Sequence, residues 1–232
     1  MATAFVQLTG LSPYLAVHQL QQALIRARLA GQVPDTVLLL EHTPTITVGR
    51  GRHAEHSVID AGDTPVIPVE RGGDATWHGP GQLVAYPIVQ LTGVKRDLRR
   101  HLGCLEQAVI DWLTSLGLLA TRDPRNTGVW LRPKQGLPLK VGSVGTACRR
   151  WVTWHGLSVN LTVDLSAQSG LRPCGFDPSV LTRVADWTAS CPTPRRAASL
   201  FAPFLAATLG LSYSGQVVEV SDPAQVLGTL RG

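Results

Sequence analysis

Three strand-like segments follow one another in the second half of the chain, and no helical pattern separates them. They cover residues 128–131, 139–145 and 152–161, and each is apolar or alternating and bounded by glycine, proline or polar residues. A strictly parallel sheet needs a helical crossover between successive strands, so this run favours antiparallel neighbours. The sequence therefore predicts an α+β fold, in which a mixed β-sheet is flanked by helices.

Helical periodicity appears in three places, over residues 12–31, 97–116 and 194–209. Ser12 is the expected N-cap of the first helix, and Gly31 is its expected C-terminal stop. Further strands are predicted over residues 36–42, 45–50, 65–70, 83–89 and 216–220. Because 232 residues suffice for a sizeable core and no low-complexity linker interrupts them, we expect a single domain over 1–232.

The formal net charge of +5 is carried mostly by scattered arginines, which favours acidic partners. The arginine doublets are short and no basic tail is present, so we expect no dedicated nucleic-acid binding. No apolar run is long enough to cross a bilayer, and the first residues lack the pattern of a secretory signal. None of the four cysteines forms a C-x-x-C pair, so we expect a cytoplasmic protein with reduced thiols and no zinc ribbon.

The densest candidate for chemistry is "RGGDATWHGPGQ", residues 71–82. Its glycines allow a ligand to approach the backbone, Arg71 can bind a carboxylate or phosphate, and His78 can act as an acid or base. The alternative is a glycine-rich hairpin whose histidine is simply hydrogen-bonded. The residues alone leave both interpretations open.

Cys174 stands in "GLRPCGF", between a proline and a glycine, in a segment without clear periodicity. Cysteine–histidine is the commonest thiol dyad, so chemistry alone ranks His78 and His155 as its partners ahead of Lys140. Alternation along residues 152–161 would place His155 on the same strand face as Leu157 and opposite Trp154.

Four segments taken together resemble the lipoyl(octanoyl) transferase family: "RGGDATWHGPGQLVAYPIV", "LKVGSVG", "WHGLSVNLTVDL" and "LRPCGF", in this order. The chain departs modestly from the family pattern, with Trp77 where tyrosine is usual and Ser158 where alanine is common. The resemblance implies a fold shared with lipoate and biotin ligases and related to class II aminoacyl-tRNA synthetase cores. It also implies a catalytic pair of Cys174 and Lys140, which replaces the histidine-first ranking.

The resemblance places substrate contacts in three stretches: Arg71, Gly72, Gly73, Asp74, Ala75, Thr76, Trp77 and His78; Ser143, Val144 and Gly145; Gly156, Leu157 and Ser158. Gly79 and His155 are expected to support the site. Gly73, Gly79 and Gly145 are candidate oxyanion donors, and Val141, Val144, Leu157 and Trp77 are candidates for lining an acyl tunnel. No metal or other cofactor is expected, because a thioester donor arrives already activated.

The resemblance further implies the reaction and its partners. An octanoyl group would pass from octanoyl-acyl carrier protein to Cys174, and then to a lysine of a lipoyl domain. The expected acceptors are the lipoyl domains of 2-oxoacid dehydrogenase E2 subunits and the glycine cleavage H protein. Arginines near the site would steer the acidic carrier protein, and a monomer without nucleic-acid or membrane partners is expected.

Three other functions fit parts of the sequence. An ATP-dependent lipoate or biotin ligase is suggested by "GRGR", residues 49–52, but such a ligase would leave "PCG" unexplained. A non-catalytic module that binds carrier protein or lipoyl domains would have an inert Cys174. A papain-like hydrolase would use His78 or His155 as base and release free acid to water.

Overall fold

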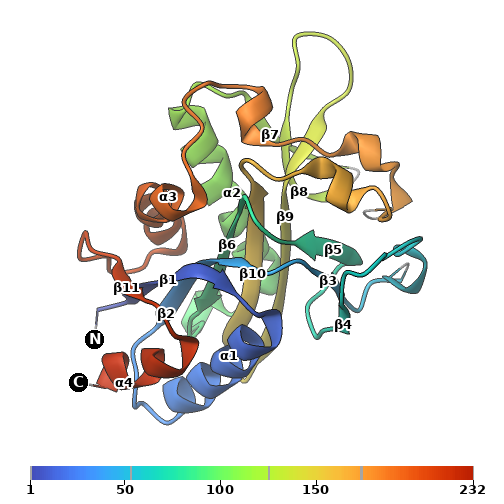
Figure 1. Cartoon of the computed structure of the whole chain (residues 1–232). Coiled ribbons are helices and arrows are strands. Elements are labelled where there is room, and N and C mark those ends of the chain that lie inside the picture. Colours follow the sequence, from blue (N-terminus) through green and yellow to red (C-terminus); the bar gives the residue numbers. More distant parts are fainter. Residues whose placement is uncertain (1, 53, 125, 173–174, 232) are drawn as a thin grey trace.

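Eight strands form the main sheet in the described part of the chain, in the order β11-β1-β2-β6-β10-β9-β8-β7 (Figure 1). The computed structural model describes residues 2–52, 54–124, 126–172 and 175–231, with only the backbone for Glu55. In this order the strands are β11 Val218–Val220, β1 Ala4–Ser12, β2 Thr36–His42, β6 Gln82–Ile88, β10 Val152–Asn160, β9 Leu139–Arg149, β8 Asn126–Leu131 and β7 Ala120–Asp123.

The sheet is mixed, as the sequence predicts. β1 lies parallel to β2 and to β11, whereas β2, β6, β10, β9, β8 and β7 pair antiparallel in succession. Strands β1 and β7 were not expected from the sequence. The register of β1 shifts between Gln7 and Leu11, near Gly10 at φ 77°, and β7 is a four-residue edge strand, so neither has sustained alternation.

Helices cover both faces of the main sheet and create two separate cores (Figure 1). The helices are α1 Tyr14–Leu29, α2 Leu98–Ser115, α3 Pro194–Leu209 and the short α4 Val226–Arg231. α2 and α3 pack together over one face, where the rings of Trp112 and Phe201 lie 5.3 Å apart. Each such ring removes enough apolar surface from water to stabilise the fold by about 1.5–3 kcal/mol. α1 covers the opposite face.

The helix ends confirm the predicted helices to within two residues but correct one cap. Ser12 is the last residue of β1, so Pro13 occupies the N-cap of α1 and no side chain caps that helix. Asp97 and Thr193 accept hydrogen bonds from the first turns of α2 and α3, and Gly210 ends α3 with a left-handed φ of 61°.

A second sheet of three strands lies beside the main sheet and carries the glycine-rich segment. It consists of β4 Val66–Pro68, β3 Thr45–Val48 and β5 Ala75–His78, with β3 parallel to β4 and antiparallel to β5. The segment 71–82 is therefore a loop followed by a short strand. Because β5 pairs with β3, the face on which each β5 side chain lies is fixed.

No helix among the described residues is long and apolar enough to cross a membrane. The prediction of a single domain over 1–232 stays a prediction.

Candidate active site

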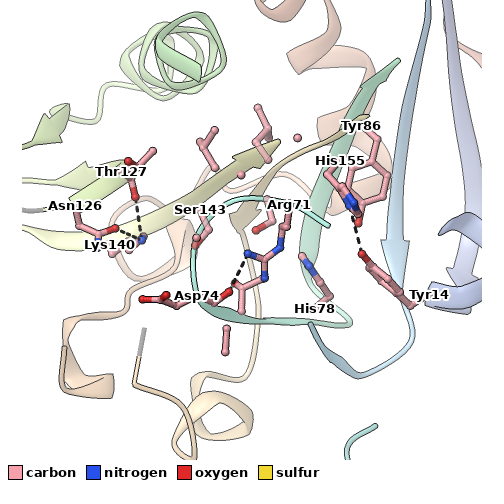
Figure 2. Close-up of a pocket in the computed structure, with 18 residues that line it drawn as sticks. Tyr14, Arg71, Asp74, His78, Tyr86, Asn126, Thr127, Lys140, Ser143 and His155 are labelled. Atoms are coloured by element: carbon pink, nitrogen blue, oxygen red, sulfur yellow. Dashed lines mark hydrogen bonds between the residues drawn. The ribbon is translucent and has the colours of Figure 1, made fainter. Parts of the chain in front are cut away.

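A cavity of about 430 Å³ opens between the 71–76 segment and the central strands β9 and β10 (Figure 2). Its wall combines apolar side chains with an unusual number of tyrosines, histidines and other polar groups. It is lined by Tyr14, Arg71, Gly73, Asp74, Ala75, Thr76, His78, Tyr86, Asn126, Thr127, Lys140, Ser143, Val144, Gly145, His155, Gly156, Leu157 and Ser158. Such mixed lining is typical of a ligand site, in which a few polar groups orient a mainly apolar ligand.

Lys140 presents a buried positive charge at one side of this cavity (Figure 2). The residue is 4% exposed, and its Nζ donates to Oδ1 of Asn126 at 3.0 Å and to the carbonyl of Thr127 at 3.1 Å. The same nitrogen lies 5.7 Å from the centre of the Trp130 ring. β8 therefore supplies the groups that fix the lysine of β9, because Lys140 pairs with Trp130 in the sheet.

Cys174 lies outside the described residues, but described residues on both sides of it lie near Lys140 or its neighbour Trp130. Phe176 packs edge-on against Trp130, with ring centroids 6.0 Å apart. The amide of Thr182 donates to the Lys140 carbonyl at 2.9 Å. Leu171 lines a small second cavity that Lys140 also lines. The segment after the predicted nucleophile thus contacts the lysine strand, and the segment before it lines a cavity that Lys140 also lines.

Arg71 holds the glycine-rich segment in shape. Its terminal nitrogens donate to the carbonyls of Gly72, Asp74 and Thr47 and to the Thr47 hydroxyl, at 2.9–3.1 Å. The same segment packs on Gly49: a Cβ built there would lie 2.2 Å from the Gly73 carbonyl oxygen. Gly49, the first residue of "GRGR", thus has a packing role. The Arg71 guanidinium has a structural role, and its substrate contact stays a prediction.

His78 is buried and hydrogen-bonded, and its burial keeps it neutral. Its Nδ1 lies 2.7 Å from Oε1 of Gln82, whose amide nitrogen donates to Asn160 Oδ1 at 3.0 Å and to the Trp77 carbonyl. Burial, followed by repulsion from His42, holds the pKa of His78 well below its usual value. The imidazole orients the cavity wall, and it is poorly placed to accept a thiol proton near neutral pH.

His155 is turned away from the strand face that alternation predicts. It has a left-handed φ of 54°, and its ring stacks on Trp154 at 4.4 Å and lies 5.9 Å from His18 of α1. The expectation that it shares a face with Leu157 is therefore wrong, because the left-handed backbone redirects the side chain. Residues in this conformation are strained and concentrate at functional sites.

Two neighbours hold the His155 ring. Its Nδ1 lies 3.5 Å from the Tyr14 hydroxyl (Figure 2), and its Nε2 lies 3.7 Å from Glu70 Oε2. Burial, and next the positive charge of Arg71, lower the pKa of His155 to about 3. Among the described residues, His18, Glu70 and His155 place one ligand atom each within 4.8 Å of one another, so this corner has donors suited to a divalent cation.

Most of the residues that the sequence analysis assigns to the site line the large cavity, including all of those in 143–145 and 156–158. Among the described candidates, Gly72, Trp77 and Gly79 do not line this cavity. The Trp77 ring packs over Gly79, where a Cβ would lie 2.2 Å from it, and both Trp77 and Val141 line the small second cavity. The sequence missed Tyr14, Tyr86, Asn126 and Thr127. Only the tyrosines could have been found from the sequence, because each is an aromatic residue with a polar hydroxyl inside a predicted apolar element.

Comparison with known proteins places this geometry in a family. Residues 13–202 match the model of the lipoyl protein ligase A/B catalytic domain. The octanoyltransferase of Gloeobacter violaceus is 41% identical over 72% of this chain and 73% of its own length. That of Syntrophotalea carbinolica is 41% identical over 77% of this chain and 82% of its own. The chain belongs to the octanoyltransferase family.

Solved structures agree on the fold of this octanoyltransferase family member. A bipartite lipoate protein ligase from Thermoplasma acidophilum, studied with its E2 lipoyl domain, superposes with a TM-score of 0.69 and 15% identity. It covers 98% of this chain and 91% of its own length. A lipoate-protein ligase A bound with ATP superposes with a TM-score of 0.66, also at 15% identity, over 97% of this chain and 93% of its own. At this identity the likeness confirms the predicted lipoate-ligase-like fold.

Proposed function

We propose that this chain transfers an octanoyl group from octanoyl-acyl carrier protein to a lysine of a lipoyl domain, through a thioester on Cys174. Its curated relatives are named octanoyltransferases, which supports the acyl group and the reaction class. The cavity of about 430 Å³ supports it too, because Val144 and Leu157 give an apolar wall for the acyl chain.

The observation that carries the proposal is the buried ammonium of Lys140 in the wall of this cavity. The Lys140 Nζ is held in place by oxygens of Asn126 and Thr127 and lies near the Trp130 ring, so its charge has a fixed position in the cavity wall. A thiolate beside this ammonium would be favoured by the positive charge. Phe176 packs on Trp130 of β8, and Thr182 donates to the Lys140 carbonyl of β9, and both contacts are consistent with Cys174 in that role.

The first half of the reaction makes the acyl-enzyme. The Cys174 thiolate attacks the carbonyl carbon of the donor thioester, a new C–S bond forms, and an oxyanion develops on the carbonyl oxygen. The bond to the carrier sulfur then breaks, and the leaving thiolate takes a proton from the Lys140 ammonium. Gly73 and Gly145 line the cavity and are the preferred candidates for backbone oxyanion donors.

The second half regenerates the pair. A neutral amine from the lipoyl-domain lysine attacks the Cys174 thioester, and the neutral Lys140 takes the proton that the amine loses. The amide forms as the Cys174 thiolate leaves, so Lys140 is again an ammonium beside a thiolate. Charge and protons balance over both halves. We place the reaction in the cytoplasm.

The test begins with mass spectrometry of the protein after incubation with octanoyl-acyl carrier protein. We expect an octanoyl adduct on Cys174 and its discharge when a lipoyl domain is added. Wild-type transfer by Cys174→Ser would overturn the covalent route. An ATP requirement would instead favour the ligase mechanism, and release of free octanoate to water would favour a hydrolase.

The lysine is tested by alkylation of Cys174 over a range of pH. In Lys140→Met we expect alkylation to shift to higher pH and transfer to fall at least about a hundredfold, the scale of a lost proton-transfer group. An unchanged alkylation profile would exclude the electrostatic role. Lys140→Arg is the matched variant, because it keeps the charge but gives up a proton far less readily.

A further inference from the structure

The turn between β9 and β10 has a backbone that its residues adopt only under strain. Arg149 pairs with Val152, so Arg150 and Trp151 are the two central residues of the hairpin turn, at φ 52° and 65°. Two-residue turns with both φ angles positive are normally built from asparagine, aspartate and glycine. A bulky arginine and tryptophan in these places are genuine outliers, and such strain persists where a site needs the side chains.

The strained turn belongs to a positively charged surface with an apolar centre. Trp151 is 38% exposed, and the guanidinium of Arg96 lies over its ring at 5.9 Å. The 90–91 segment fixes the turn, since Leu91 donates to the Trp151 carbonyl at 2.7 Å and Gln90 to the Arg150 carbonyl. We call this surface the basic tip, and its residues are Arg96, Arg149, Arg150 and Trp151.

The charge of the basic tip is not neutralised within the part of the chain that the structure describes. Arg96, Arg149 and Arg150 are exposed and form no ion pair there, and Arg99 and Arg100 follow in the first turn of α2. The acids nearby are already engaged: Asp97 caps α2, and Asp35 pairs with Arg28 at 2.7 Å. Val94, 85% exposed, adds a second apolar group. Exposed cations around a tryptophan are the composition of a protein-docking surface for an acidic partner.

Distance decides which acidic partner fits. Lys140 and Arg149 lie nine residues apart on β9, which is roughly 30 Å of extended strand. The turn is at the lower end of β9 and β10 in Figure 1. An acceptor carries its lysine on the domain itself and must dock at the cavity. A carrier protein delivers its acyl group on a long flexible arm, so its body can dock far from the reacting sulfur.

The surface also offers a path from the basic tip toward the site. A cavity of about 380 Å³ is lined both by Arg149 and by Glu70, and Glu70 precedes Arg71 in the wall of the large cavity. Arg50 lines the same path and adds a further positive charge. We propose that the basic tip is the docking surface for the acidic acyl-carrier donor, whose arm runs along this path. This inference rests on the proposed function.

The test exploits the strain. Arg150→Asn combined with Trp151→Gly gives the turn the residues that it prefers while removing the docking side chains. We expect this variant to melt roughly 2–8 °C higher, because relief of strain raises Tm by about 2–4 °C per kcal/mol in a chain of this size. We expect its Kd for octanoyl-acyl carrier protein to rise at least tenfold. Its kcat/KM with a small octanoyl thioester as donor should remain within twofold of wild type.

A charge test runs beside it. Arg149→Glu with Arg150→Glu should weaken carrier binding more than Arg150→Asn with Trp151→Gly does. The wild-type affinity for the carrier should also fall as salt is added. Arg196→Glu with Arg231→Glu is the matched control, since it makes the same change of net charge on exposed residues of α3 and α4. The control should bind the carrier within twofold of wild type.

The outcomes separate the two proposals. Unchanged carrier affinity in both tip variants overturns the docking surface, and a rise in KM for the lipoyl domain alone reassigns it to the acceptor. Carrier binding that depends on the tip, without acyl transfer from either donor, leaves the docking surface standing and overturns the proposed function.

Discussion

At the scale of single residues, the site depends on how one lysine is held. Lys140 is one of three lysines in the chain, and its Nζ is fixed by a side-chain oxygen of Asn126 and a backbone oxygen of Thr127. The side-chain contact can be removed by mutation, whereas the backbone contact survives replacement of the Thr127 side chain. This difference makes Asn126 a testable positioning residue.

We predict that Asn126→Ala lowers kcat about tenfold and leaves KM for the donor nearly unchanged. The ammonium loses a fixed acceptor and spends less time in the geometry that stabilises the thiolate, so alkylation of Cys174 at neutral pH should slow as well. Steady-state kinetics and alkylation rates measure both effects. Asn126→Asp should not restore alkylation, because its negative charge would offset the ammonium charge that favours the thiolate.

Thr127→Ala is the control for this prediction, since its carbonyl stays in place. A loss of kcat in Thr127→Ala as large as in Asn126→Ala would show that the β8 end as a whole matters, and not the amide oxygen.

At the scale of elements, the segment that leads to Cys174 is attached to another loop by its backbone. The carbonyl of Gly170 accepts from the amides of Ile59 and Asp60 at 2.8 and 3.1 Å, and the amide of Arg172 donates to Ser57 at 2.8 Å. Gly170 has no side chain at the closest approach, where a Cβ would lie 1.8 Å from the Asp60 carbonyl oxygen. These contacts fix the described end of the segment, residues 170–172, before Cys174.

We predict that Gly170→Ala separates the two loops and lowers transfer more than tenfold. Overpacking of this kind costs about 1–3 kcal/mol, which urea unfolding measures. Gly103→Ala is the control, because it lies in α2 with no atom within 4 Å of the added Cβ, and alanine favours a helix. Full activity in Gly170→Ala would show that acyl transfer does not need the attachment of residues 170–172 to the 57–60 loop.

At the scale of the whole molecule, burial of histidines makes the fold sensitive to acid. His101 of α2 is 4% exposed and its Nε2 has no hydrogen-bond partner among the described residues. Burial lowers the pKa of His101 to about 4. The unfolded chain binds a proton here at higher pH than the folded chain does, so this group reduces stability as pH falls from about 6.5 toward 4.

We predict that His101→Leu removes part of this acid sensitivity. Between pH 7.5 and pH 5 the wild type should lose about 2 kcal/mol of unfolding free energy through this residue alone, and the variant should not. Urea unfolding at the two pH values measures the difference. Equal losses in both proteins would show that His101 takes up its proton in the folded state as readily as in the unfolded state.

The sequence by itself determined the elements and the candidate chemistry. Periodicity marked α2 and α3 because one stripe of each is apolar, and the run of strands without helices indicated the mixed sheet. Motif resemblance named Lys140 and Cys174. General thiol chemistry favoured a histidine partner instead. The resemblance favoured Lys140 because the four motif segments occur together and in the same order as in the family.

Only the tertiary structure decided how those residues meet. Asn126 reaches Lys140 because β8 pairs with β9, and Tyr14 reaches His155 because α1 crosses β10, contacts over 14 and 141 residues that no local pattern encodes. The left-handed backbone at His155 likewise overrode alternation. Local propensity acts over a few residues, whereas the position of a side chain in a site is set by whatever packs against it across the fold. The chain itself therefore specified the chemical groups, and the sheet order specified which of them act together.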